Sequence, residues 1–131
     1  MSGVLWCAVV WWARLAAHVS LWRWLLATAM LGLSVLSLMP AALPIPSTGW
    51  DKSNHALGFA VLAFLAYGAW PGRIPLSLLG LLGYGGLIEV LQSLTRDRMA
   101  EWSDLWADGV GLLIGAALAS TMQRLAVVRS T

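Results

Sequence analysis

Several residues that could carry out acid–base or ligand chemistry stand at the ends of apolar segments. Asp51 and His55 are four residues apart at the start of one segment, so on a helix they share a face. Asp104 and Asp108 have the same spacing at the start of another segment, and Glu89 lies near the end of a third. A histidine beside carboxyl groups can act as a general base, hold a divalent ion or bind a polar ligand.

The position of Glu89 is the least favourable of these for a charged side chain, because Glu89 lies within the longest apolar run, Ile74–Leu94. If this run and the one that contains Asp108 are membrane helices, the helical rise places Glu89 and Asp108 about 6–8 Å below the membrane boundary. A charge inside a bilayer costs roughly 2.5–3.5 kcal/mol, so these carboxyl groups require partners. The partners available at the same level are Lys52, His55, Gln92 and Arg98.

The composition is that of a membrane protein. Sixty per cent of the 131 residues are apolar and only 11% are charged, against about 25% charged in soluble domains. The net charge of +2 is small and its basic residues flank apolar runs, which argues against nucleic acid as a partner. Cys7 is the only cysteine, so an internal disulfide and a paired-cysteine zinc site are both excluded.

Four apolar runs predict four membrane-spanning helices. Their approximate limits are Trp24–Met39, Asn54–Trp70, Ile74–Leu94 and Asp104–Met122. A helix needs about 20 residues to cross a bilayer, and the two shorter runs reach this length with their flanking residues. None has the strict alternation of a barrel strand. We therefore expect an all-α, polytopic membrane protein with a four-transmembrane-helix bundle.

The N-terminal residues predict a segment of a different kind. Val4–Trp12 is apolar but too short to span, and its tryptophans suit a helix lying at the headgroup level. We expect an interfacial, amphipathic segment over residues 1–21, the transmembrane domain over residues 22–124 and a cytoplasmic tail over residues 125–131.

The basic residues predict the orientation. With four spans, five arginines lie on one side and three basic residues on the other; these are Arg14, Arg23, Arg73, Arg124 and Arg129 against Lys52, Arg96 and Arg98. The positive-inside rule then places both termini in the cytoplasm of a bacterial-type inner (plasma) membrane. The polar residues described above would face the outer side. Glycines in the later spans predict close helix packing, because small residues let membrane helices approach. They are Gly83, Gly86, Gly111 and Gly115.

Three motifs in register resemble those of the VanZ-like integral membrane proteins. The first is Asp51-Lys52-x-x-His55-x-x-x-Phe59, and the second is Gly86-x-x-Glu89-x-x-Gln92. The third is Arg98-x-x-Glu101-x-x-Asp104-x-x-x-Asp108-x-x-Gly111, and together the motifs cover roughly residues 24–122. The family usually has asparagine where this chain has Asp108. The resemblance implies a four-span fold and a cell-envelope role, since the family takes its name from a protein associated with teicoplanin resistance.

Three classes of function fit these residues. The first is recognition of a lipid-linked or peptidoglycan-related envelope molecule, in addition to the bilayer itself. The second is an intramembrane hydrolase or transferase using His55 with Glu89 or Asp108, and the third is a small proton-coupled carrier using Glu89. The sequence favours binding over catalysis, because it has no HExxH motif and no serine with an evident base. It assigns no cofactor, no metal ligand and no oligomeric state. The expected ligand-binding residues are Asp51, Lys52, His55, Glu89, Gln92, Arg98, Asp104 and Asp108.

Overall fold

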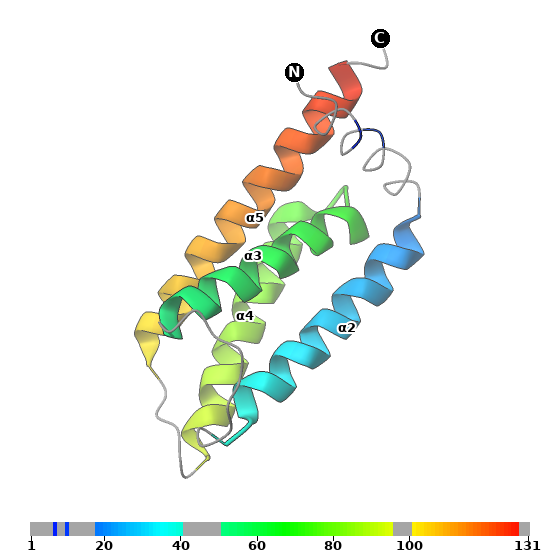
Figure 1. The fold of residues 1–131 in the computed structure, drawn as a ribbon. Helices are drawn as coiled ribbons and strands as arrows, with labels where there is room; N and C mark the ends of the chain where they lie inside the picture. Colours follow the sequence, from blue (N-terminus) through cyan, green and yellow to red (C-terminus); the bar gives the residue numbers. More distant parts are fainter. Residues whose placement is uncertain (1–6, 8–9, 11–17, 41–50, 96–100, 129–131) are drawn as a thin grey trace.

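In the part of the chain that the structure describes, four long helices make up the fold (Figure 1). The computed structural model describes Cys7, Val10 and residues 18–40, 51–95 and 101–128. In chain order the helices are α2, Val19–Leu38; α3, Asp51–Ala69; α4, Ile74–Ser93; and α5, Trp102–Val128. Within these ranges there is no β-strand. The all-α, four-helix architecture predicted from the sequence is confirmed.

Prolines set several helix boundaries. The C-cap of α2, Met39, has extended backbone angles of φ −64° and ψ 145°, as expected for a residue before proline. Helix α3 ends at Ala69, just before Trp70 and Pro71. Pro75 lies in the first turn of α4, where its missing N–H has no helical partner to lose.

Three of the four helices, α2, α4 and α5, are long and apolar enough to cross a membrane. Helix α3 is similar in length, with 19 residues, but its first turn is polar. It packs against each of the other three helices and supplies much of the buried core. Its buried side chains are Phe59, Leu62, Ala63, Ala66 and Ala69. Helix α3 thus packs against protein on much of its surface, and Lys52 in its first turn is paired with Glu101.

Successive helices run in opposite directions, so their ends alternate along the chain (Figure 1). The ends of α2 and α4 and the starts of α3 and α5 therefore meet at one end of the bundle, which we call the polar end. Helices α2 and α5 lie on either side of α3 and α4. The opposite end is held by Arg23, whose Nε donates to the carbonyl of Ala69 at 3.2 Å. Its guanidinium also lies 5.3 Å from the centre of the Trp70 ring.

The helices are joined by close contacts between small and large residues. Gly68 leaves room for the ring of Trp22, which also packs edge-on to Phe64 with centroids 6.1 Å apart. Trp22 is thus buried in the core, unlike Trp24, which is 74% exposed.

A second set of contacts fastens α4 to α2. The hydroxyl of Tyr84 donates to the carbonyl of Met30 at 2.7 Å and also lies 2.7 Å from Ser34 Oγ. These bonds fix the rotation of α4, and therefore the direction in which its later polar residues point. The predicted boundary at residues 21 and 22 falls inside α2, and α5 continues past residue 124 to Val128. The interfacial segment predicted for residues 1–21 lies mostly outside the described residues and stays a prediction.

A candidate ligand site at the polar end

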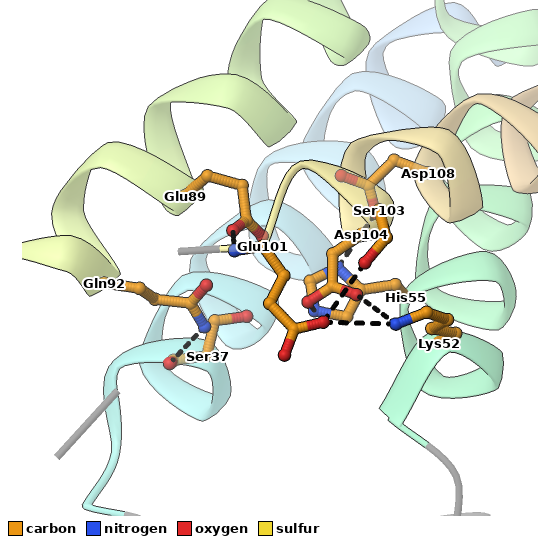
Figure 2. Close-up of polar contacts among 9 residues, drawn as sticks. All are labelled: Ser37, Lys52, His55, Glu89, Gln92, Glu101, Ser103, Asp104 and Asp108. Atoms are coloured by element: carbon orange, nitrogen blue, oxygen red, sulfur yellow. Dashed lines mark hydrogen bonds and ion pairs between the residues drawn. The ribbon is translucent and has the colours of Figure 1, made fainter. Parts of the chain in front are cut away.

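Four ionisable side chains meet between α3, α4 and α5 at the polar end (Figure 2). We call them the polar cluster: His55, Glu89, Asp104 and Asp108. Glu89 is 3% exposed, Asp104 5% and Asp108 1%, and the His55 side chain is 10% exposed. Burial of three carboxyl groups and an imidazole together is costly unless they are paired or bind something.

His55 stands between the two aspartates of α5. Its Nδ1 lies 2.9 Å from Asp108 Oδ1, and its Nε2 lies 3.7 Å from Asp104 Oδ2. The aspartates reach both sides of the ring because they are four residues apart on one face of α5. With Asp108 accepting from Nδ1, the proton of a neutral imidazole stays there and Nε2 presents its lone pair.

The meeting of α3 and α5 follows from glycines on the same face as Asp108. A Cβ on Gly111 would overlap the backbone carbonyl of Ala56, and one on Gly115 would overlap that of Ala60. The two backbones are thus nearly in contact, as small residues permit in membrane helices. This close approach carries Asp108 to His55.

Glu89 enters the cluster from α4. Its Oε2 accepts from the backbone N–H of Glu101 at 3.0 Å, just before the start of α5. A carboxylate is favoured there by the positive end of the α5 dipole. Its other oxygen, Oε1, is buried without a hydrogen bond within the described part of the chain, as is Asp108 Oδ2.

An exposed ion pair covers the cluster on the solvent side. Lys52 Nζ donates to Glu101 Oε2 at 3.2 Å and lies 3.7 Å from Asp104 Oδ1. Ser103 Oγ also donates to Glu101 Oε2, at 3.1 Å (Figure 2). The hydrogen bond from Lys52, followed by that from Ser103, lowers the pKa of the Glu101 carboxyl from its ordinary value of 4.5. Glu101 is therefore ionised at neutral pH.

Gln92 lies at the same end of the bundle but makes a different kind of contact. Its Nε2 donates to the backbone carbonyl of Ser37 at 2.9 Å, one of the last carbonyls of α2. Such carbonyls have no partner within their own helix. In this structure Gln92 therefore ties α4 to the end of α2, and Figure 2 shows its amide directed toward Ser37.

Two predicted site residues are not placed. Asp51 begins α3, but its side chain lies outside the described residues, and so does the whole of Arg98. The structure brings together the other predicted residues, with Gln92 at the margin. Sequence reasoning left Glu101 and Ser37 out of the site. Glu101 could have been predicted from the sequence, since it belongs to the third family-like motif. The Ser37 contact could not, because it is made by a backbone carbonyl and has no sequence signal.

The glycines expected to pack helices divide into two groups. Gly111 and Gly115 touch α3, as described above. Around Gly83 and Gly86, by contrast, no described atom lies within 4 Å of the position of a Cβ, apart from their own helix. The α4 glycine in close contact is Gly85, which faces Asp108 and Phe59.

The arrangement is rich in hydrogen-bond acceptors. One ligand atom from each of His55, Glu89 and Asp104 lies within 4.8 Å of the other two. Such a set can accept hydrogen bonds from a bound molecule or hold a cation. His55, oriented by Asp108, is also the residue best placed to accept a proton.

A comparison with protein families identifies the chain. The family model described as VanZ/LLP1 matches residues 4–123. The protein belongs to the VanZ/LLP1 family. Together with its spanning helices, this makes it a VanZ-like, multi-pass membrane protein. Comparison with curated proteins gave no match, and comparison with solved structures gave none either. The candidate site of this VanZ-like protein therefore has to be interpreted from its own geometry.

Proposed function

We propose that this VanZ-like protein recognises a lipid-linked or peptidoglycan-related molecule of the cell envelope at its polar end. The observation that carries the proposal is a buried acceptor, Glu89 Oε1, without a hydrogen bond among the described residues. A buried acceptor left unpaired costs about 1–3 kcal/mol. A ligand that donates to this oxygen recovers that free energy.

This acceptor defines the chemistry of the ligand. A carboxylate accepts hydrogen bonds and attracts positive charge, so the ligand presents a hydroxyl, amide or ammonium group to the cluster. Headgroups of phospholipids and the sugars and peptides of peptidoglycan precursors carry such groups. A role related to glycopeptide or teicoplanin resistance fits a ligand of this class.

Lys52 and Glu101 supply a second, exposed contact. Their side chains are 37% and 59% exposed, and an ion pair exposed to solvent contributes little to stability. A ligand phosphate can therefore take the place of Glu101 on Lys52 at little cost. Recognition would combine a phosphate at Lys52 with a donor group at Glu89.

The charge distribution supports an outer location for this site. Arg23 and Arg73 lie at the opposite end of the bundle, where Arg23 binds the end of α3. Basic residues are enriched on the cytoplasmic side of membrane proteins. The polar end would then face the outer side of the membrane, with both termini in the cytoplasm.

A hydrolase or transferase is the second candidate, and one contact favours it. Asp108 orients His55 through the 2.9 Å contact at Nδ1, which leaves Nε2 to accept a proton from water or a substrate hydroxyl. In this case turnover of the bound envelope molecule would accompany its recognition. Loss of turnover in His55→Gln, with binding retained, would support this candidate.

Native mass spectrometry of the full-length protein in detergent tests recognition. The probes are phosphatidylethanolamine, phosphatidylglycerol, undecaprenyl phosphate and the lipid-linked peptidoglycan precursor, each added alone. We expect one probe to bind more tightly than the others. Its affinity should fall at least about tenfold in Glu89→Gln, because this variant loses a charged acceptor worth about 1.5–3 kcal/mol. Leu87→Met, on an exposed face of α4, should bind as wild type. Equal binding of all probes, or no loss in Glu89→Gln, would refute the proposal.

A further inference from the structure

We propose that His55, Glu89 and Asp104 bind one divalent metal ion of the Zn²⁺ or Mn²⁺ type. This goes beyond recognition of an envelope molecule, because the ion is bound by the protein alone. With the ion in place, an envelope molecule would meet the open coordination position of the ion instead of Glu89 Oε1 itself. The three residues come from α3, α4 and α5, and one ligand atom of each lies within 4.8 Å of the others.

These separations suit a common coordination shell. Metal–ligand distances of about 2.0–2.2 Å put neighbouring ligands about 3–3.5 Å apart and opposite ligands about 4.2 Å apart. The His55 Nε2 to Asp104 Oδ2 separation of 3.7 Å is close to the first value. Side-chain rotations would bring Glu89, whose ligand atom lies within 4.8 Å of the other two, into the same shell.

The carboxylate oxygens are divided between protein and ion. Glu89 uses Oε2 to accept from the Glu101 N–H, and its Oε1 is buried without a hydrogen bond in the described part of the chain. Asp104 directs Oδ1 to Lys52 at 3.7 Å and Oδ2 to His55 at 3.7 Å. Each of the two residues thus has one oxygen near a group outside the three proposed ligands, the Glu101 N–H or Lys52, and Asp104 has its other oxygen near His55.

The burial of Glu89 is evidence for a bound cation that is independent of the spacing of the ligand atoms. It is 97% buried, being 3% exposed, and its Oε1 has no described donor. Three buried carboxyl groups also exceed the positive charge that Lys52 and a protonated His55 supply. A divalent cation corrects both the unpaired oxygen and the excess negative charge.

Asp108 supports the metal site without being one of its ligands. A metal-binding histidine generally donates its second N–H to a carboxylate or carbonyl, which orients the ring and raises its basicity. The 2.9 Å contact from His55 Nδ1 to Asp108 Oδ1 is this arrangement. It leaves Nε2, on the side of Asp104, as the ligand atom. Asp108→Asn should retain it, because the amide oxygen also accepts from Nδ1.

The ligand types select the ion. An imidazole favours zinc and other transition ions, whereas carboxylates also suit manganese, magnesium and calcium. One imidazole with two carboxylates fits Zn²⁺ or Mn²⁺ best. Three protein ligands leave at least one coordination position for another molecule.

The test uses the whole chain in a Cys7→Ser background. Its affinity tag is removed, and the protein is then treated with a chelator to remove bound metal. Zn²⁺ and Mn²⁺ are added alone, and binding is measured by calorimetry and elemental analysis, with no lipid probe present. We expect one ion per chain and an increase in thermal stability. Glu89→Gln and Asp104→Asn should each weaken binding by at least about 100-fold, and Asp108→Asn by about tenfold or less. Leu87→Met should bind as wild type.

Two results would overturn the metal site. One is the absence of stoichiometric binding of either ion to the wild type. The other is unchanged binding in whichever of Glu89→Gln and Asp104→Asn is recovered folded, since each removes one proposed ligand. Because no lipid is present in this test, its failure would leave the recognition proposal standing. Conversely, a protein that binds the ion but shows no preference among the lipid probes would refute only the recognition proposal.

Discussion

Asp108 on α5 rests directly against Gly85 on α4. A Cβ at Gly85 would lie 2.5 Å from Asp108 Oδ2 and 3.0 Å from the ring of Phe59. The carboxyl group that orients His55 thus occupies the space in which a side chain at position 85 would stand. The place of Asp108 in the polar cluster depends on a residue with no side chain on a different helix.

Gly85→Ala should therefore destabilise the bundle and displace Asp108. Overpacking of this kind costs about 1–3 kcal/mol, which a lower thermal unfolding temperature in detergent would report. Gly83→Ala is the matched control, because its Cβ would meet no described atom within 4 Å. Replacing a helical glycine there should stabilise by up to about 1 kcal/mol. Equal behaviour of the two variants would contradict the helix rotation described here.

The contact between α3 and α5 predicts a more severe loss. In Gly111→Ala the new methyl group would meet the backbone of Ala56, which cannot rotate away as a side chain can. We expect a loss of about 3 kcal/mol or more and poor recovery of folded protein by size-exclusion chromatography. Gly109→Ala, two residues earlier with no described neighbour within 4 Å, should be recovered as wild type. A stable Gly111→Ala protein would show that α3 and α5 are further apart.

The ion pair of Lys52 and Glu101 predicts a salt-sensitive acid limb of stability. The pKa of Glu101 is lowered in the folded protein, chiefly by the hydrogen bond from Lys52. Its contribution is fully present above the ordinary pKa of 4.5 and is lost as pH falls through the lower folded value. Thermal unfolding followed against pH should show a shallower acid limb in Glu101→Gln than in wild type. The difference should shrink in high salt, because both side chains are partly exposed to solvent.

Removing the charge of Glu89 should abolish function while leaving the fold intact. In Glu89→Gln the amide oxygen still accepts from the Glu101 N–H, so thermal stability and protein level should stay near wild type. Susceptibility to glycopeptides or lipid-cycle inhibitors on overexpression is the measurement. Asp108→Asn should be milder, since an amide oxygen at position 108 still accepts from His55. If Glu89→Gln changed susceptibility as much as the wild type does, the Glu89 carboxyl group would have a structural role only.

The proposed orientation, with both termini in the cytoplasm, predicts which loops are accessible from outside. A cysteine at Asp97, between α4 and α5, should react with an impermeant maleimide on intact cells in a Cys7→Ser background. One at Gly72, between α3 and α4, should react only after permeabilisation. The reverse pattern would place the polar end in the cytoplasm.

The sequence by itself determined the helices and which polar residues lie at the same end of the bundle. Apolar run length and the prolines after α2 and α3 are local features, so the predicted runs match α2 to α5 to within a few residues at most ends. Antiparallel order then follows from short connections, and it brings Glu89 and Asp108 to the same end. Spacing along one helix also placed Asp104 and Asp108 on one face.

Only the tertiary structure decided how each helix is rotated and what its polar atoms meet. Helix rotation depends on packing between distant segments, such as Tyr84 against Met30, which no local pattern encodes. For this reason the sequence did not distinguish Gly85 from its neighbouring glycines, and it assigned Gln92 to the ligand although its amide binds the end of α2. The division of carboxylate oxygens between protein donors and the centre of the cluster is likewise a property of three helices together.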